Sequence, residues 1–307
     1  MNGSPDSTLV MLGLVGTGKT NFLVALDVVL DHQADPDGLH HSELAADRAY
    51  LQPLREQWLR GEVLKHTSRQ PPPPPHQLLV RHPVTGTSAG FYLPDLAGET
   101  FDAQFETRSF PLGFSERLQQ AGGVFLFVHC NHNADHAILE DPGFMELAPA
   151  LPAASPPPQS AVAEPDWRLE DASPQVKLVD LLQFIAEIGP QQRPLNIAVI
   201  LSAWDLVENA PYLGPHAAAE IPKDPAQFFS IHWPLLDQFL RGNTEMFRIR
   251  VFGVSARGGG NTPEEIARLT KFDRPSDRIL VVDGSHRSND LTRPVRWLLG
   301  LLQSATL

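Results

Sequence analysis

Eight residues near the start of the chain constrain the fold more than any other feature. Residues 13–20 are Gly-Leu-Val-Gly-Thr-Gly-Lys-Thr and match the pattern G-x-x-x-x-G-K-[ST] in full. They close a short β-like run at 8–14 and open a stretch at 19–32 with apolar residues at helical spacing. A strand, a glycine-rich turn and a helix in this order predict a loop that wraps around a phosphate group.

The chemistry of phosphate binding explains these residue types. Glycines let consecutive backbone N–H groups curve around an anion without Cβ clashes, and the start of the helix adds the positive end of its dipole. Lys19 would reach the β- and γ-phosphates and support catalysis, and the Thr20 hydroxyl would bind Mg²⁺. The predicted phosphate site consists of Gly13, Val15, Gly16, Thr17, Gly18, Lys19, Thr20 and Asn21.

Strand-like and helix-like segments alternate along the rest of the chain. The strand candidates are 76–82, 89–94, 122–130, 195–201, 246–254 and 279–282. The helix candidates are 42–60, 173–188, 225–241, 263–271 and 291–303. This alternation predicts an α/β fold with three layers, in which helices cover both faces of a mostly parallel central sheet.

Composition excludes several classes of protein. Of 307 residues, 42% are hydrophobic, which is enough for a sizeable core and excludes wholesale disorder. The net charge of −12 argues against nucleic acid or an acidic membrane surface as the main partner. One cysteine forms no internal disulfide, and the N-terminus has no signal-peptide pattern. We therefore predict a cytoplasmic protein without integral membrane contact.

A second motif follows the strand candidate at 89–94. Residues 95–99 are Asp-Leu-Ala-Gly-Glu, so that an acidic side chain comes directly after a strand. Asp95 would hold the hydration shell of Mg²⁺, and Gly98 would let a backbone N–H approach the γ-phosphate. Alone, this D-x-x-G pattern is also typical of an ordinary turn. The phosphate loop earlier in the chain favours the interpretation as a Mg²⁺ and γ-phosphate motif.

Two later strands end in residues suited to a purine base. Residues 201–205 are Leu-Ser-Ala-Trp-Asp, and the Asp205 carboxylate would accept hydrogen bonds from N1–H and N2–H₂ of guanine, a pair that adenine does not offer. Residues 253–257 are Gly-Val-Ser-Ala-Arg, where a backbone N–H would meet O6. Ligands of open α/β sheets bind at carboxyl ends of strands. The predicted base site is Trp204, Asp205, Ser255, Ala256 and Arg257.

The set of motifs resembles the translation-factor-related and Ras-like class of P-loop GTPases. More narrowly, the chain is similar to the bacterial double-GTPase family, second subtype. The narrower likeness rests on residues 61–67, on the strand pair before Asp95, and on residues 291–299 (Leu-Thr-Arg-Pro-Val-Arg-Trp-Leu-Leu). The resemblance implies a Ras-like G domain that binds GTP and GDP, hydrolyses GTP and acts as a molecular switch in bacterial conflict and defence systems.

The resemblance also implies roles for particular residues. Thr67 is the best match to the threonine of the first switch, which binds Mg²⁺ and senses the γ-phosphate. The implied catalytic residues are then Lys19, Thr67, Gly98 and Glu99, and the implied metal ligands are Thr20, Thr67 and Asp95. An unidentified effector or activating protein would respond to the bound nucleotide.

Two positions depart from the family pattern. The guanine motif is usually Asn/Thr-Lys-x-Asp, but Ala203 here cannot place an alkyl chain over the base. Two outcomes are open: the base is bound more weakly, or Trp204 substitutes by stacking on it. Glu99 stands where Ras-like enzymes have a glutamine that orients water. Slow intrinsic hydrolysis is therefore expected, with Arg60, Arg69 and Arg108 as candidate arginine fingers. A GTP-dependent scaffold without useful hydrolysis, or an ATPase, remains an alternative.

Prolines mark the segments outside the expected core. Of the 29 prolines, five form the run 71–75 and six fall within 149–165. Such stretches favour polyproline II or loop structure. We expect one GTPase domain over 1–307, with a helical and switch insertion at about 36–75 and a proline-rich insertion at about 131–172. Both insertions are candidate partner contacts.

Overall fold

Five parallel strands form the centre of one sheet in the computed structural model, and antiparallel strands extend both edges. The structure describes residues 5–32, 35–42, 51–64, 78–94, 105, 107, 109, 112–130, 172–190, 193–209 and 222–302. The sheet order is β2-β3-β4-β1-β5-β6-β7-β8-β9. Its strands are β1 (Ser7–Leu12), β2 (His40–His41), β3 (Leu78–Arg81), β4 (Ser88–Tyr92), β5 (Ala121–His129), β6 (Leu195–Ser202), β7 (Phe247–Ser255), β8 (Leu280–Asp283) and β9 (His286–Ser288).

The parallel strands end at different heights along the carboxyl side of the sheet. β4, β1, β5, β6 and β7 run parallel, and Leu12 at the end of β1 pairs with Leu126 of β5. β5 and β6 then continue beyond β1, to the pair His129 and Ser202. Because β1 stops first, the loop that follows it lies beside the carboxyl ends of its neighbours.

Alternation along the central strands separates two core clusters. Phe125 and Phe127 of β5 belong to one cluster, whereas Leu126 and Val128 belong to the other, and all four are fully buried. Successive side chains of a strand point to opposite faces of the sheet, so an unbroken apolar strand must be covered on both sides.

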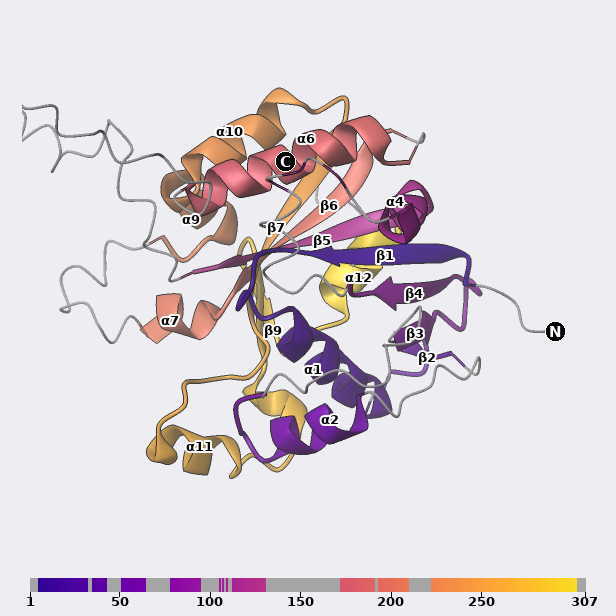
Figure 1. Cartoon of the computed structure of the whole chain (residues 1–307). Helices are drawn as coiled ribbons and strands as arrows, with labels where there is room; N and C mark the ends of the chain where they lie inside the picture. Colours follow the sequence, from indigo (N-terminus) through magenta and orange to yellow (C-terminus); the bar gives the residue numbers. More distant parts are fainter. Residues whose placement is uncertain are drawn as a thin grey trace, which may run out of the picture.

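Helices supply the cover on each face, as Figure 1 shows. The first cluster includes residues of α1 (Lys19–Asp31), α2 (Gln52–Leu59) and α12 (Arg293–Leu298). The second includes residues of α4 (Leu112–Gln119), α6 (Pro174–Ile188), α7 (Trp204–Asn209), α9 (Pro225–His232) and α10 (Pro234–Gly242). Helix α11 (Pro263–Leu269) and the 3₁₀ helix η4 (Pro275–Arg278) connect β7 to β8. The predicted three-layer α/β class is confirmed.

The single helix predicted at 225–241 is wrong, because a proline divides it. α9 ends at His232, Trp233 adopts φ −130° and ψ 51°, and α10 begins at Pro234. Proline has no N–H to continue the helical ladder and disfavours the helical conformation in the residue before it. The structure also contains the strand β9 and the helices α4 and α7, which the sequence patterns did not predict.

Only the second half of the helix predicted at 42–60 can be compared. β2 ends at His41, α2 occupies Gln52–Leu59, and residues 43–50 lie outside the described part of the chain. The two proline-rich stretches, 71–75 and 149–165, lie outside it as well. Within the described ranges, no helix combines the length and apolar composition that crossing a bilayer requires.

Gly253 of β7 offers a test of the packing between the sheet and α7. A Cβ built on Gly253 would lie 2.4 Å from Cδ2 of Trp204, whose ring is fully buried. We expect Gly253→Ala to lower the free energy of unfolding by about 1–3 kcal/mol, since the core must shift to admit the methyl group. Urea unfolding measures this difference.

Gly113→Ala is the matched control for this substitution. Gly113 lies in α4, and a Cβ added there would have no neighbouring atom within 4 Å. At this exposed position in the first turn of α4, alanine should change stability by less than about 0.5 kcal/mol. Equal effects of the two substitutions would contradict the described contact between β7 and α7.

Candidate nucleotide-binding site

The loop between β1 and α1 has the backbone conformation that its glycines permit. Gly13, Gly16 and Gly18 have φ values of 143°, 75° and 85°, which side chains with a Cβ rarely adopt. A Cβ on Gly13 would lie 2.5 Å from the carbonyl oxygen of Phe127, so the loop crosses β5 in direct contact. Gly18 caps α1, and the chain enters the helix at Lys19.

Lys19 folds back over the loop that precedes it. Its Nζ donates to the carbonyl oxygens of Gly13 at 2.6 Å and Leu14 at 2.7 Å. The Thr17 hydroxyl donates to the same Leu14 oxygen at 2.8 Å. Burial lowers the pKa of the Lys19 ammonium to about 8, because no carboxylate of the described residues offsets its lost hydration. An incoming phosphate would supply negative charge at this point.

A cavity of about 270 Å³ lies at the carboxyl ends of β5, β6 and β7, next to this loop. It brings together three of the sequence motifs, which are far apart in the chain. The lining residues are Gly16, Gly18, Asn21, Phe22, Phe127, His129, Ile200, Ser202, Ala203, Asp205, Leu206, Val254, Ser255, Ala256, Arg257, Gly259, Gly260 and Asn261. The lining combines polar and charged residues with apolar ones, which suits a heterocyclic base joined to phosphates.

A chain of hydrogen bonds fixes the Asp205 carboxylate. The Ser255 hydroxyl donates to Oδ1 of Asp205, and the Gly258 N–H donates to the same hydroxyl at 3.1 Å. Ala203, two residues before Asp205, has a positive φ of 56°. This is an uncommon conformation for alanine, and such strain is concentrated at functional sites. Asp205 is therefore held at the cavity wall by the neighbouring strand end.

The base-stacking role predicted for Trp204 is withdrawn. Its ring is fully buried in the core of the face covered by α9, where it meets Phe228 edge-on at 5.3 Å between ring centroids. Its Nε1 donates to Glu208 at 2.9 Å. Trp204 is absent from the described cavity wall. Its neighbours Ala203 and Asp205 line the wall, and the indole faces away from it.

Thr20 and Asn21 lie in the first turn of α1. The Thr20 hydroxyl has no hydrogen-bond partner within the part of the chain that the structure describes. Oδ1 of Asn21 is buried without a hydrogen-bond partner there, although Asn21 lines the cavity. Both oxygens are thus free to meet a ligand. The donor set suits Mg²⁺ at Thr20, since this ion prefers hydroxyl, carboxylate and phosphate oxygens.

The remaining predicted site residues cannot be placed. Thr67, Asp95, Gly98 and Glu99 lie outside the described residues. Among the residues that are described, no three His, Cys, Asp or Glu side chains form a group able to bind a metal ion. Of the candidate arginine fingers, Arg60 pairs with Glu62 at 2.8 Å, and Arg69 and Arg108 lie outside the described ranges.

Several cavity residues were not predicted from the sequence. His129 ends β5 beside Ser202, and Gly259, Gly260 and Asn261 follow the Ser-Ala-Arg motif. Three consecutive glycines at 258–260 were the available signal. Gly258 has φ 90°, and a Cβ there would lie 2.2 Å from the carbonyl oxygen of Arg278. The loop needs glycine for a close backbone approach, as the phosphate loop does.

The fold and the site together define a nucleotide-binding protein of the P-loop class. A protein-family model described as Double-GTPase 1 matches residues 10–298. The chain therefore belongs to the Double-GTPase 1 family, which confirms the double-GTPase likeness and replaces the second subtype that was expected. A comparison with curated proteins finds no significant match.

Solved structures also include similar chains. One is an ADP-ribosylation-factor-like GTP-binding protein, a small COPII coat GTPase from Encephalitozoon cuniculi in complex with GDP. It shares 11% sequence identity, and the alignment covers 81% of this chain and 70% of that chain with a TM-score of 0.31. At this TM-score the likeness carries no argument about function.

The lowered pKa of Lys19 predicts proton uptake on nucleotide binding. In the free protein about half of the Lys19 ammonium is deprotonated near pH 8. Bound phosphate favours the charged form, so its pKa rises and affinity should fall as the pH increases above 8. Calorimetry with GDP at about pH 8.5, in two buffers of different ionisation enthalpy, measures the uptake.

Lys19→Met is the control for this titration. It keeps most of the side-chain length without the titrating amine, so proton uptake near pH 8.5 should disappear. Undiminished uptake by Lys19→Met would assign the proton to another group.

Proposed function

We propose that this chain is a GTP-binding, Mg²⁺-dependent and GTP-hydrolysing molecular switch. One observation carries the proposal: the phosphate loop, Asp205 and the segment 255–257 line the same cavity. Residues of the phosphate loop and of the proposed base site thus line a single cavity, which supports a ligand that joins phosphates to a base. Membership of the Double-GTPase 1 family supports GTP as the nucleotide.

Guanine recognition is assigned to Asp205 and to the backbone beside it. The Ser255 hydroxyl occupies one carboxylate oxygen, Oδ1, which leaves acceptor capacity on Asp205 for N1–H and N2–H₂ of guanine. Backbone N–H groups at Ala256 and Arg257 are the candidates to meet O6. Adenine has a donor at the position of O6 and lacks the N2 amino group, so the same wall would disfavour it.

The phosphates are assigned to the other end of the cavity. Lys19 and the backbone of the phosphate loop would hold the β- and γ-phosphates, and Thr20, Thr67 and Asp95 would hold Mg²⁺. When bound, Mg²⁺ neutralises charge that develops on the phosphate oxygens. Gly98 would admit a backbone N–H to the γ-phosphate, and Glu99 would contact the attacking water.

A partner protein would read the nucleotide state. Thr67 and Gly98 are proposed to change position with the γ-phosphate, as switch segments of GTPases do. To shift a two-state population almost completely, a ligand must bind one state more tightly than the other by about 5.5 kcal/mol. A partner or activator must therefore bind the GTP state far more tightly than the GDP state.

Asp205→Asn tests the base assignment. It keeps the side-chain volume but removes the charge and replaces one acceptor oxygen with an NH₂ donor, which would face a donor of the base, so GDP affinity should fall at least about 100-fold. Titration with GDP and with ADP measures the effect. Asp237→Asn on α10 is the control, since this acid binds Arg241 outside the cavity and should leave affinity unchanged.

The nucleotide that co-purifies with the protein is an independent test. Recovery of GDP or GTP is expected, because the base site favours guanine. Recovery of ADP or ATP without any guanine nucleotide would overturn the GTPase assignment, whatever the behaviour of Asp205→Asn.

Intrinsic hydrolysis is expected to be slow, below about 10⁻² s⁻¹ in single turnover without a partner. The Glu99 carboxylate adds negative charge beside a phosphate that gains charge in the transition state. Glu99→Gln should therefore speed hydrolysis about tenfold, the effect of about 1.4 kcal/mol on the barrier. Glu264→Gln, on the exposed first turn of α11, is the control. Fast wild-type hydrolysis that Glu99→Gln leaves unchanged would refute this role.

A further inference from the structure

Helix α2 lies between the helix of the phosphate loop and the loop at the base end of the cavity. It packs in the first core cluster through Leu54 and Trp58, and Figure 1 shows it beside α1 and near α11. After α2 the described chain continues to Leu64. By sequence, the candidate switch threonine, Thr67, follows soon after. The contacts at the two ends of α2 therefore bear on both halves of the site.

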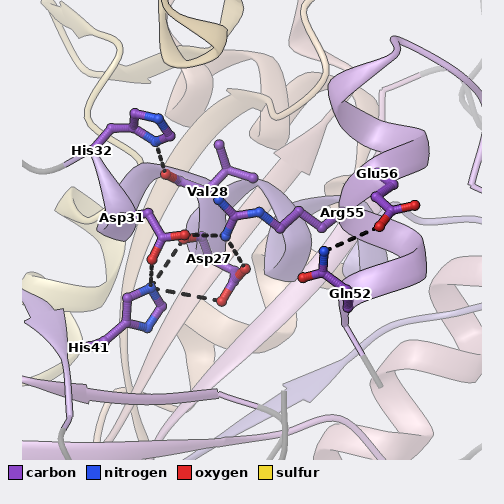
Figure 2. Close-up of polar contacts among 8 residues, drawn as sticks. All are labelled: Asp27, Val28, Asp31, His32, His41, Gln52, Arg55 and Glu56. Atoms are coloured by element: carbon purple, nitrogen blue, oxygen red, sulfur yellow. Dashed lines mark hydrogen bonds and ion pairs between the residues drawn. The ribbon is translucent and has the colours of Figure 1, made fainter. Parts of the chain in front are cut away.

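The first half of α2 is fixed to α1 by charge, as Figure 2 shows. Arg55 donates to Oδ2 of Asp27 at 2.9 Å and forms an ion pair with Asp31. His41 of β2 approaches Oδ1 of Asp31 at 2.9 Å on the other side. The Asp27 side chain is almost fully buried, and a buried carboxylate needs such partners. α2 thus keeps a fixed position on α1.

The second half of α2 is fixed to residues 255–258, which we name the base loop. Nε1 of Trp58 donates to the carbonyl oxygen of Ala256 at 3.2 Å. In return, the Arg257 guanidinium donates to the carbonyl oxygen of Gly61 at 2.6 Å. Ala256 and Arg257 line the cavity, whereas Trp58 is fully buried behind them. The two bonds tie the cavity wall to the end of α2.

Arg278 closes this arrangement from η4. Its guanidinium lies 3.8 Å from the centroid of the Trp58 ring and donates to the Trp58 carbonyl oxygen. The Arg278 carbonyl oxygen leaves space only for glycine at 258. Arg278 is 5% exposed, and burial together with the nearby Arg257 lowers its pKa to about 10. A buried cation is costly to retain, and here it holds an aromatic ring in place.

We propose that Trp58, held by Arg278, is a positioning residue for the base loop, so that filling the base end of the cavity also orders the end of α2. The proposal rests on the proposed function in taking guanine as the base. Its physical basis is direct: Ala256 and Arg257 cannot move relative to Trp58 and Gly61 without breaking the hydrogen bonds that join them. Nucleotide binding and the position of residues 61–64 are then coupled.

Trp58→Phe tests the proposal with a minimal change. Phenylalanine keeps an aromatic ring under Arg278 and removes the donor to Ala256. The loss of one hydrogen bond should weaken GDP binding about fivefold, mainly through faster release. Binding of inorganic pyrophosphate, measured as competition, should stay unchanged, since the phosphate loop is untouched.

Trp297→Phe is the matched control. Trp297 belongs to the same core cluster and packs on Phe252 from α12, whereas the hydrogen bond to Ala256 of the base loop comes from Trp58. The substitution Trp297→Phe should lower the melting temperature, as Trp58→Phe does, without changing GDP affinity. Hydrogen exchange adds a second readout at the amides of Gly61 and Glu62, which donate to the carbonyl oxygens of Trp58 and Gln57. GDP should slow the exchange of these two amides in the wild type but not in Trp58→Phe.

The outcomes separate this proposal from the function on which it rests. Equal GDP affinity and equal protection in wild type and Trp58→Phe would overturn the positioning role. A parallel loss of GDP and pyrophosphate binding, matched by Trp297→Phe, would also overturn it, because general destabilisation would then explain the result. If the wild type binds ADP in place of GDP, the proposed function fails, and the same titrations with ADP decide the role of Trp58.

Discussion

The register of the parallel strands β1, β5, β6 and β7 is the constraint on which the rest of the molecule depends. Leu12 pairs with Leu126, and the neighbouring strands run on to His129 and Ser202. This offset leaves room for the phosphate loop beside β5, and it places the ends of β6 and β7 around the same cavity. A slip by one residue would turn every side chain of a strand to the opposite face. The two core clusters, each apolar and fully covered, oppose such a slip.

Close backbone approach is the second theme, and it appears on both sides of the cavity. Gly13 lies against the carbonyl of Phe127, and Gly258 lies against that of Arg278. At each point a side chain would occupy space already taken by backbone. In both the phosphate loop and the base loop, a glycine thus lies in close contact with the backbone of a neighbouring segment. Only the phosphate loop carries a recognised sequence pattern.

Sequence patterns predicted the central strands, the phosphate loop and the grouping of Asp205 with Ser255, because these depend on local periodicity and on the strand ends of a parallel sheet. They failed for Trp204, since adjacent residues after a strand can face either the cavity or the core, and only packing against Gly253 and Phe228 decides which. They missed the division at Trp233, where the residue before a proline overrode helical periodicity.

The sequence by itself determined the class of ligand and the fold class. The eight residues around Lys19 predict a phosphate ligand, and the alternating apolar segments predict a covered parallel sheet. The tertiary structure alone decided how the two ends of the site are joined. Trp58 and Ala256 are far apart in the chain, and no local pattern marks the bond between them. Contacts of this kind arise from the packing of whole elements, so they become visible only when α2, the base loop and η4 are in place.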